Sequence, residues 1–326
     1  MLQDRFGRVL TYLRVSLLKG CNLSCKYCMP ERIPFRMDEV LSAAELEKLV
    51  GRFVERGITK LRLTGGEPTI RPDLVEIVER LARLEGVRDI ALSTNAVRLR
   101  QLAQPLRAAG VRRINVSLDS LEADAFKQIT GSAALHQVLD GIEAAREVGF
   151  HPIKLNTVVM RGVNDGEVEA LVAFAAVRGL EIRFIEMMPT GATHGLQPRH
   201  FVSNQDVFER LGGAARWEAV GHSANAGPAR DYRDRARPQA PTIGFINPLS
   251  QNFCSDCNRL RLTADGKLRT CLFGQQDLPL RPHLTAPDWQ RRLDAAIDRA
   301  VGEKQESHQL ESGDWGSMIS FVQVGG

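Results

Sequence analysis

The sequence predicts an α/β fold: an incomplete (β/α)6 TIM-like barrel followed by a smaller C-terminal domain. From Thr11 to Ile185, short apolar segments with a period of two alternate with amphipathic stretches of about 10 to 15 residues, which is typical of strand–helix units. Units in this order favour a parallel sheet with right-handed crossovers. The alternation ends near Pro189, so we place one domain at residues 1–189 and a second at 190–326.

The expected strands and helices follow one another along the first domain. We predict strands at residues 12–18, 60–64, 89–94, 113–119, 153–159 and 181–185, and helices at 43–56, 73–84, 99–109, 134–148 and 166–177. The strands are apolar on one face only; in the first, Leu13, Val15 and Leu17 share a face opposite Arg14. A sheet covered by helices on both faces reads apolar throughout. These strands therefore fit a barrel with a packed outer face and a polar inner face.

The inner face of this barrel is unusually polar. It carries Arg14, Arg62, Asn115, Ser117, Lys154 and Asn156. A closed barrel fills its interior with Val, Ile and Leu, and burying unpaired charges is costly. We therefore predict that the interior holds a polar, anionic ligand. An antiparallel sheet with one wet face is the alternative, but the intervening helices disfavour it.

The C-terminal domain has a different pattern. Residues 190–241 are rich in Gly, Arg and polar residues, with one helix expected at 204–211. Short strands are expected at 242–246, 260–262 and 267–269, the last two joined by the turn signal Asp265-Gly266, and a helix at 287–301. We expect this domain to cover the open side of the barrel.

Composition limits the location of the protein. The 43 basic and 39 acidic residues give a net charge of +4, which fits an anionic small molecule only weakly. No apolar run of 18 residues predicts a membrane span, and the N-terminal residues do not resemble a signal peptide. We therefore expect a cytoplasmic protein without a membrane partner, in a compartment that keeps thiols reduced.

The six cysteines form two groups of three: Cys21, Cys25 and Cys28 (the first cysteine group), and Cys254, Cys257 and Cys271 (the second cysteine group). Odd numbers in each group and a reducing compartment disfavour disulfides. The first group follows the first strand, where barrel enzymes place their chemistry. Three thiolates suit a four-iron cluster with one iron left open. Structural zinc needs four protein ligands, and the histidine closest in sequence is His136.

The Cys-x3-Cys-x2-Cys loop resembles the signature of the radical S-adenosylmethionine (SAM) superfamily, and Thr64-Gly65-Gly66-Glu67-Pro68 resembles its Gly-Gly-Glu motif. The resemblance implies that SAM binds the open iron and is cleaved to a 5′-deoxyadenosyl radical. Two glycines would let the backbone approach a ligand, and Glu67 would pair with the ammonium group of SAM. The residues implied to line the SAM site are Tyr27, Gly66, Ser117 and Met188. Met188 could equally be core packing, and Ser117 a satisfied polar residue.

The second cysteine group leaves two readings open. Zinc could use His283 as a fourth ligand, whereas a second cluster would have an open iron for substrate. In the adjacent strand, Arg259 and Arg261 alternate with leucines and share a side. Together with Arg14, Arg62 and Lys154 they make five candidate cations, and arginine pairs suit phosphate oxygens. We interpret Arg230, Arg233, Arg235 and Arg237 as solvated surface charges.

The chain also resembles the GTP 3′,8-cyclase family, the lyases of the first step of molybdenum cofactor biosynthesis. The resemblance is carried by residues 12–16, 63–68, 115–120, 183–186 and 253–261 and by the final Gly325-Gly326. It implies two [4Fe-4S] clusters and SAM, with the radical taking hydrogen from ribose C3′ of GTP before the new radical attacks guanine C8. The residues implied to bind GTP are Arg14, Arg62, Ser93, Lys154, Arg259, Leu260 and Arg261.

The same resemblance implies a one-electron donor and a cyclic pyranopterin monophosphate synthase that receives the product, and leaves room for a homodimer. One rival is a radical SAM enzyme acting on a peptide or another small molecule. The other is a zinc-stabilised nucleic-acid binder, which the low net charge and an aromatic content of 6% disfavour. We therefore expect no nucleic-acid partner.

Two positions depart from the family pattern. Ser93-Thr94-Asn95-Ala96 replaces a common Thr-Thr-Asn-Gly, which keeps the first hydroxyl but disfavours a positive φ at Ala96. The tail ends Val324-Gly325-Gly326 where isoleucine is common before the two glycines. This tail is slender enough to enter an active site, and the alternative is disorder at a chain end.

Overall fold

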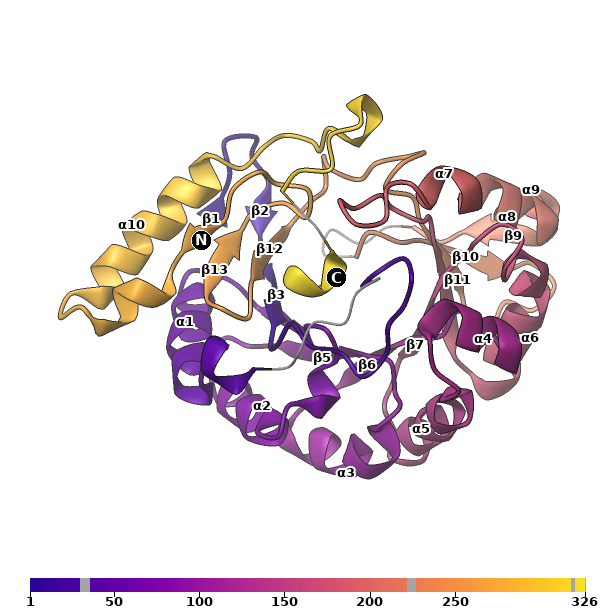
Figure 1. Cartoon of the computed structure of the whole chain (residues 1–326), viewed down its shortest axis with the longest axis horizontal. Helices are drawn as coiled ribbons and strands as arrows, with labels where there is room; N and C mark the ends of the chain where they lie inside the picture. The colour runs from indigo at the N-terminus through magenta and orange to yellow at the C-terminus, as the bar shows by residue number, and fades with distance from the viewer. Residues whose placement is uncertain (30–35, 222–226, 318–319, 326) are drawn as a thin grey trace.

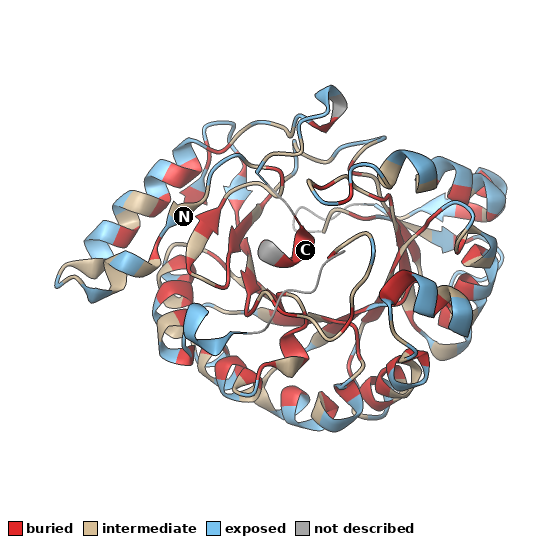
Figure 2. Ribbon diagram, in the orientation of Figure 1, coloured by how far each residue is buried: buried red, intermediate tan, exposed pale blue. Residues whose placement is uncertain are grey.

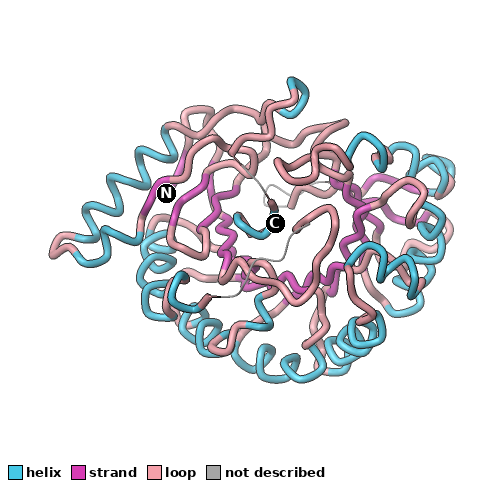
Figure 3. The backbone as a smooth tube through the Cα atoms, in the orientation of Figure 1, coloured by secondary structure: helices cyan, strands magenta, loops and turns pink. Residues whose placement is uncertain are grey.

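The computed structural model describes residues 1–29, 36–221, 227–317 and 320–325. Its centre is an arc of parallel strands with helices outside (Figures 1 and 3). The six predicted strands are present as β3 (Tyr12–Ser16), β4 (Lys60–Thr64), β5 (Asp89–Thr94), β6 (Arg113–Ser117), β7 (Ile153–Val158) and β8 (Glu181–Ile185). They lie side by side in chain order, each parallel to the next. The predicted incomplete barrel is confirmed.

The five predicted helices are also present: α1 (Ala43–Glu55), α2 (Leu74–Ala82), α3 (Leu99–Ala109), α5 (Leu135–Glu147) and α6 (Val168–Arg178). Helix α1 begins with a capping box, in which Ser42 accepts from the Glu45 amide and Glu45 accepts from that of Ser42. A further helix, α4 (Ala123–Thr130), was not predicted. It is short and lies directly before α5, so the sequence pattern did not separate it from a loop.

The C-terminal part extends the same sheet at both edges. Strand β12 (Arg259–Leu262) pairs in parallel with β3, and β11 (Ile243–Ile246) pairs in parallel with β8. Antiparallel strands follow outward: β13 (Lys267–Arg269) and β14 (Leu278–Pro279) beyond β12, and β10 (Arg230–Asp234) and β9 (Trp217–Ala219) beyond β11. The two ends of this 12-stranded sheet do not pair within the described residues, so the barrel stays open.

The remaining elements lie around this sheet. They are the hairpin β1 (Leu2–Gln3) and β2 (Val9–Leu10), the helices α7 (Gln197–His200), α8 (Asn204–Arg210), α9 (Gly213–Arg216) and α10 (Trp289–Gly302), and the 3-10 turns η1 (Met37–Glu39), η2 (Pro68–Ile70), η3 (Asp165–Glu167), η4 (Arg281–Thr285), η5 (Leu310–Ser312) and η6 (Phe321–Gln323). Helix α10 lies on the outside (Figure 1), where Asp294 forms ion pairs with Arg52 of α1 and with Arg56 at the C-cap of α1.

The apolar core fills the space between the strands and the helices (Figure 2). Leu13, Val15, Leu61 and Leu63 point outward from the strands and are fully buried there, as predicted from their alternation. This packing leaves the opposite strand face for a binding site. No described helix has the length and apolarity needed to cross a membrane.

Candidate active site

A cavity of about 290 Å³ opens at the carboxyl ends of the barrel strands. Both parts of the chain line it: the first cysteine group and polar residues of β3 to β8 on one hand, and Phe253, Arg259, Arg261, Leu272 and Phe321 on the other. Cys254, Cys257 and Cys271 are not among the described lining residues, although Arg259 and Leu272 next to them are. This central cavity therefore connects the neighbourhoods of the two cysteine groups.

The first cysteine group sits in a loop that follows β3 and is held by the unpredicted helix α4. The amides of Ser24 and Lys26 donate to the carbonyls of Thr130 and Ile129, at 2.9 and 3.0 Å. The Asn95 side chain donates to Oδ1 of the Asn22 side chain at 2.8 Å and to Cys21 Sγ at 3.8 Å. The end of α4 and the loop after β5 thus fix the three thiols at the cavity.

The Gly65-Gly66 pair packs against the start of this cysteine loop. A side chain at Gly66 would place its Cβ 1.9 Å from the Gly20 carbonyl oxygen, and one at Gly65 would lie 2.6 Å from that of Leu18. The Gly66 amide donates to Leu18 and the Glu67 amide to Gly20, at 2.8 and 2.9 Å. The two glycines thus allow two backbone segments of the protein to approach closely, and both also line the central cavity, where we expected them to admit a ligand.

The Glu67 carboxylate is buried and accepts hydrogen bonds from four protein donors. Its Oε1 accepts from the Thr69 amide at 3.0 Å and from the hydroxyls of Thr69 and Thr94 at 2.6 Å. Its Oε2 accepts from the Asn95 amide at 2.6 Å. Glu67 therefore ties the end of β4 to the end of β5, although its side chain also borders the cavity.

The first cysteine group is largely buried and lies near carboxylates, and both conditions raise the pKa values of its thiols. Burial and then the charge of Glu67 raise the pKa of Cys21 to about 11, and burial followed by Cys21 and Asp119 raises the pKa of Cys28 to about 12. Burial also raises the pKa of Asp119 itself to about 6, although its carboxylate accepts from Tyr27 Oη at 2.8 Å and from the Val158 amide. Three thiolates are stable here only with a compensating positive group, and a cluster iron supplies one.

The residues expected to contact SAM come together in the structure. Tyr27, Gly66, Ser117 and Met188 all line the central cavity. Met188 also packs against the apolar cluster around Phe273, so its core-packing and lining roles coexist. Ser117 is exposed to the cavity, which disfavours the alternative of a satisfied buried hydroxyl.

Guanidinium groups crowd the other part of the cavity. Arg14, Arg62, Arg259 and Arg261 line it, as their strand positions predicted. Burial and then the charges of Arg14 and Arg259 lower the pKa of Arg261 well below its usual range. Burial also lowers the pKa of Arg14 to about 10; the charge of Tyr12 opposes this shift, and neighbouring arginines add to it. Cations held this close to one another call for an anionic ligand.

Several buried polar atoms in this region have no hydrogen-bond partner among the described residues: Nε of Arg62, Nε of Arg183 and Oδ1 of Asn156. Buried polar groups are normally paired, so these atoms lack a partner that the described part of the chain does not supply. Arg183 was not predicted as a site residue. Its strand position, two residues after the start of β8, carried the same inward-facing signal as Arg62.

Three further predicted GTP residues have different placements. Ser93 lines the cavity, 3.5 Å from a terminal nitrogen of Arg62. Lys154 is buried and forms an ion pair with Glu181, and it is not among the described lining residues. Leu260 lies in the core on the opposite face of β12, fully buried. The structure therefore gathers the arginines and Ser93 but leaves Lys154 and the Leu260 side chain outside the cavity lining.

The second cysteine group is surrounded by cations and amides. Burial raises the pKa of Cys257, but the charges of Arg259 and Lys304 outweigh it and lower that pKa to about 7. The Lys304 ammonium lies 3.7 Å from Cys257 Sγ, and Gln305 Nε2 lies 3.3 Å from Cys271 Sγ. Neither residue was predicted. A buried ammonium needs an anionic partner, and a cluster held by three thiolates provides one.

Among the described residues, no three His, Cys, Asp or Glu side chains are placed to hold a single metal ion. In a four-iron cluster each thiolate binds a different iron, so the sulfurs need not converge on one point.

The C-terminal tail enters the cavity, in agreement with its slender sequence. The Gly325 carbonyl accepts from Arg14 at 3.1 Å and from Arg261 at 3.0 Å, while Phe321 and Val322 line the cavity. A Cβ at Gly325 would lie 2.7 Å from Thr64 Cγ2, and its φ is +68°. Glycine is required at this position for both reasons. Gly326 lies outside the described residues.

Ala96 adopts a positive φ of 62°, contrary to the expectation that alanine would disfavour it. Its amide donates to Thr94 Oγ1 at 3.0 Å, and its carbonyl packs where a side chain at Gly141 would reach within 2.3 Å. These contacts hold the left-handed conformation at a cost of about 1–2 kcal/mol.

Comparisons with known proteins agree with this geometry. Residues 15–175 match the family model of the radical SAM superfamily, and residues 180–310 match that of Molybdenum Cofactor Synthesis C. The fold resembles Streptococcus suis SuiB bound to S-adenosylmethionine, with a TM-score of 0.65 over 91% of this chain and 68% of that chain at 13% identity. SuiB bound to its precursor peptide SuiA gives 0.64 over 97% and 76%, at 12% identity. Fold and site thus define a radical SAM enzyme, a class that uses SAM and a [4Fe-4S] cluster.

Similar sequences narrow the class. The GTP 3′,8-cyclase of Listeria monocytogenes is 41% identical over 95% of this chain and 92% of its own length. Those of Geobacter sulfurreducens and Pseudomonas fluorescens are 42% identical, over 95% and 100% of this chain and 95% and 98% of their own lengths. The chain belongs to the GTP 3′,8-cyclase family, which acts at the first step of molybdenum cofactor biosynthesis.

Proposed function

We propose that this protein converts GTP to (8S)-3′,8-cyclo-7,8-dihydroguanosine 5′-triphosphate. One observation carries the proposal: buried guanidiniums gather in a cavity that also contains the first cysteine group and reaches the residues beside the second. Arginine forks match phosphate oxygens, and the unpaired nitrogens of Arg62 and Arg183 are available to a triphosphate. A peptide would not need this density of positive charge.

In this proposal the first cysteine group holds the cluster that binds SAM, and Tyr27, Gly66, Ser117 and Met188 surround SAM. When bound, SAM and the cluster supply the 5′-deoxyadenosyl radical that takes a hydrogen atom from substrate. The protein excludes water from this radical with apolar groups such as Met188 and Phe321 at the cavity wall. Glu67 pairs with the ammonium group of SAM in this proposal, and its four protein hydrogen bonds also hold together the ends of β4 and β5.

The second cysteine group holds a second [4Fe-4S] cluster, for which the buried Lys304 and Gln305 provide the donors. Arg14, Arg62, Arg259, Arg261 and Ser93 bind GTP, and we add Arg183. Lys154 reaches the substrate only if it exchanges its ion pair with Glu181. Leu260 contributes to the GTP site through its backbone in β12, because its side chain is buried in the core. Arg14 and Arg261 also hold the Gly325 carbonyl, so the tail lies against the substrate.

We also infer the surroundings of the enzyme. We divide the chain into a barrel of residues 1–189 and a C-terminal domain of residues 190–326 that covers the cavity. The reaction requires a one-electron donor, and its product passes to a cyclic pyranopterin monophosphate synthase. Clusters held by six reduced thiols favour a cytoplasmic location.

The test is an anaerobic incubation of reconstituted protein with SAM, a reductant and each of the four ribonucleoside triphosphates, followed by mass spectrometry. We expect about eight irons per chain, from two four-iron clusters, and a cyclised nucleotide only with GTP. Formation of 5′-deoxyadenosine that is indifferent to GTP would reject the substrate and favour a radical SAM enzyme acting on a peptide or another small molecule. Zinc in place of iron in anaerobically purified protein would reject the whole proposal.

A further inference from the structure

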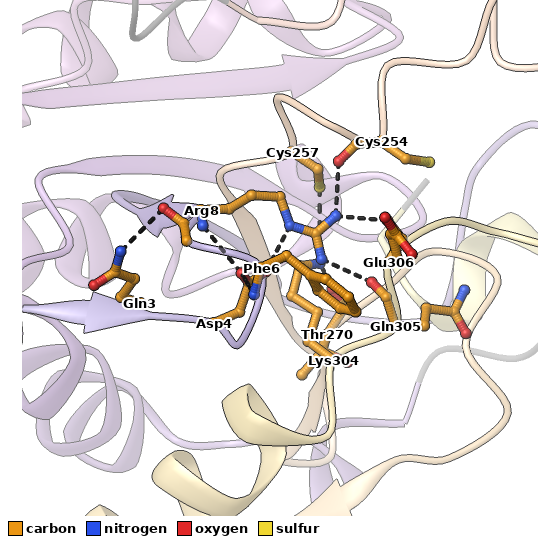
Figure 4. Close-up of polar contacts among 11 residues, drawn as sticks. Gln3, Asp4, Phe6, Arg8, Cys254, Cys257, Thr270, Lys304, Gln305 and Glu306 are labelled. Atoms are coloured by element: carbon orange, nitrogen blue, oxygen red, sulfur yellow. Dashed lines mark hydrogen bonds and ion pairs between the residues drawn. The ribbon is translucent and has the colours of Figure 1, made fainter.

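The N-terminal hairpin ends at the second cysteine group, far from it in sequence. Strands β1 and β2 pair Leu2 with Leu10 and Gln3 with Val9. In the turn between them, the Asp4 carboxylate accepts from the amides of Phe6 and Arg8, both at 3.0 Å. The turn thereby holds the Arg8 side chain in one direction, toward the C-terminal part of the chain (Figure 4).

Arg8 is buried, and its guanidinium contacts one carboxylate and three backbone carbonyls. Its Nε donates to Asp4 Oδ2 at 2.6 Å, and the side chains are 7% and 0% exposed. One terminal nitrogen donates to the carbonyls of Cys254 and Glu306 at 2.7 and 2.6 Å; the other donates to that of Gln305 at 2.7 Å. Arg8 therefore joins the backbone of one cysteine of the second group to the segment 305–306 (Figure 4).

Lys304 and Gln305 donate hydrogen bonds to the two other cysteines. Lys304 is 2% exposed, and its ammonium contacts the Thr270 carbonyl and Cys257 Sγ. Nε2 of the Gln305 side chain donates to Cys271 Sγ at 3.3 Å. Each cysteine of the second group is thus held, through its carbonyl or its sulfur, by a set made of Asp4, Arg8, Lys304 and Gln305.

Hydrogen bonds to cluster sulfurs and nearby positive charge stabilise the reduced state, and so raise the reduction potential. Partners one shell beyond the ligands orient the ligands and tune the metal site. We propose that Asp4 and Arg8 are positioning residues of the second cysteine group, and that they set its reduction potential by aligning Lys304 and Gln305 with the sulfurs. This inference rests on the proposed function, in which this group holds a cluster.

The test measures the midpoint potential of the second cluster in the full chain, by electron paramagnetic resonance during an anaerobic redox titration. The background is Cys21→Ser/Cys25→Ser/Cys28→Ser, so that only the second group binds iron. In this background we compare Arg8→Lys, which keeps the charge but cannot reach three carbonyls, with Arg5→Lys, an exposed arginine of the same turn. We expect Arg8→Lys to shift the potential to more negative values, with iron content retained, and Arg5→Lys to leave it unchanged.

Gln305→Leu and Lys304→Gln test the sulfur contacts directly, with Gln290→Leu on the exposed face of α10 as the control. We expect both to move the potential in the same direction as Arg8→Lys. If Arg8→Lys unfolds or loses iron, Asp4→Asn, which weakens the contact that holds Arg8, decides the proposal by the same shift to more negative values. Unchanged potentials in variants that retain iron would overturn the inference while leaving the second cluster intact. Absence of iron in the parent background would instead reject the proposed second cluster.

Discussion

The two cysteine groups have the same number of thiols but opposite electrostatic surroundings. Burial, Glu67 and Asp119 raise the pKa values of Cys21 and Cys28 in the first group. In the second group Arg259 and Lys304 lower the pKa of Cys257, whereas burial raises that of Cys254 against the opposing charge of Arg259. Backbone carbonyls at the end of α4 hold the loop of the first group; side-chain cations and amides hold the second group.

This difference fits two kinds of chemistry. Negative surroundings disfavour an added electron, and positive surroundings favour it. The first site is suited to passing an electron on to SAM, because a cluster that holds its electron weakly is a strong reductant. The second site is suited to keeping an anionic nucleotide close, since the arginines that bind phosphate continue into its cationic surroundings. Two sets of three cysteine ligands thus suit different functions because the residues around them differ.

The largest expected effect comes from removing one cysteine of each group. Cys25→Ser should reduce 5′-deoxyadenosine formation to background, because SAM then lacks its cluster. Cys257→Ser should abolish the cyclised nucleotide but leave SAM cleavage measurable. Mass spectrometry of both products after anaerobic incubation separates the two outcomes. Ser255→Ala, an exposed change in the second loop, should alter neither product. Equal loss of both products in Cys25→Ser and Cys257→Ser would contradict separate roles for the two groups, SAM cleavage at the first and binding of GTP at the second.

The next effect concerns the cations of the second site. Arg261→Ala should raise the KM for GTP about 10- to 100-fold, because a hydrogen bond to a charged group contributes about 1.5–3 kcal/mol. Arg235→Ala is the matched control, since this arginine is about half exposed and lies 4.0 Å from Glu218 on the surface. Steady-state kinetics with GTP should show the increase for Arg261 alone. A similar KM in the two variants would remove Arg261 from the GTP site.

The substitution Glu67→Gln tests the role of the carboxylate beside the first cysteine group. The new amide group would face donors that Glu67 now accepts from, and leaving them unsatisfied costs about 1–3 kcal/mol. We expect that loss in the free energy of unfolding of the cluster-free protein, measured by denaturant titration. Glu85→Gln changes an exposed carboxylate in the same manner and should be neutral. Equal stability of both variants would mean that Glu67 does not hold the β4 and β5 loops.

A pH effect follows from Asp119. Its pKa in the folded protein is about 6, raised by burial above the unfolded value, so its contribution to stability is present at low pH and is lost as pH rises through 6. Asp119→Asn should therefore gain stability relative to the unsubstituted cluster-free protein between pH 4.5 and 7. Denaturant midpoints of both proteins across this range provide the measurement. A difference that stays constant with pH would show that the carboxyl is ionised throughout.

The smallest effect is expected at Ala96, next to the Asn95 that supports the first cysteine group. Ala96→Gly relieves the positive φ, worth about 1–2 kcal/mol, but adds freedom to the unfolded chain, worth about 0.5–1 kcal/mol. We expect a net gain of about 1 kcal/mol or less in the free energy of unfolding. Ala170→Gly, at an exposed position within α6, should instead lose about 1 kcal/mol. Destabilisation of both variants would contradict the strain at Ala96.

Much of the fold could be predicted because alternation reveals strand faces. The inward direction of Arg14, Arg62 and Arg261 followed from a period of two. The same period says nothing about depth along the barrel or about neighbours. Lys154 faces inward as predicted, yet it meets Glu181 on the adjacent strand before it reaches the cavity.

Contacts between distant segments could not be predicted from local pattern. Glu67 was predicted to bind SAM, which stays a prediction, but its hydrogen bonds with Thr94 and Asn95 at the end of the next strand had no signal in its motif. Arg8 and Lys304 carried no local signal, because a buried cation looks like a surface cation until its partners are known. The first and second cysteine groups were evident from spacing alone; their different surroundings were not.

The pairing of β3 with β12 has a consequence for synthesis of the chain. The hydrogen bond between Thr11 and Asn258 next to this pair spans 247 residues. One edge of β3 therefore stays unpaired on the ribosome until β12 emerges, roughly 10–50 s later at ordinary elongation rates. An open strand edge is a site for pairing with other chains. The unpaired edge of β3 therefore favours aggregation during synthesis, and Arg259 and Arg261 join the first cysteine group at the cavity only after β12 has paired with β3.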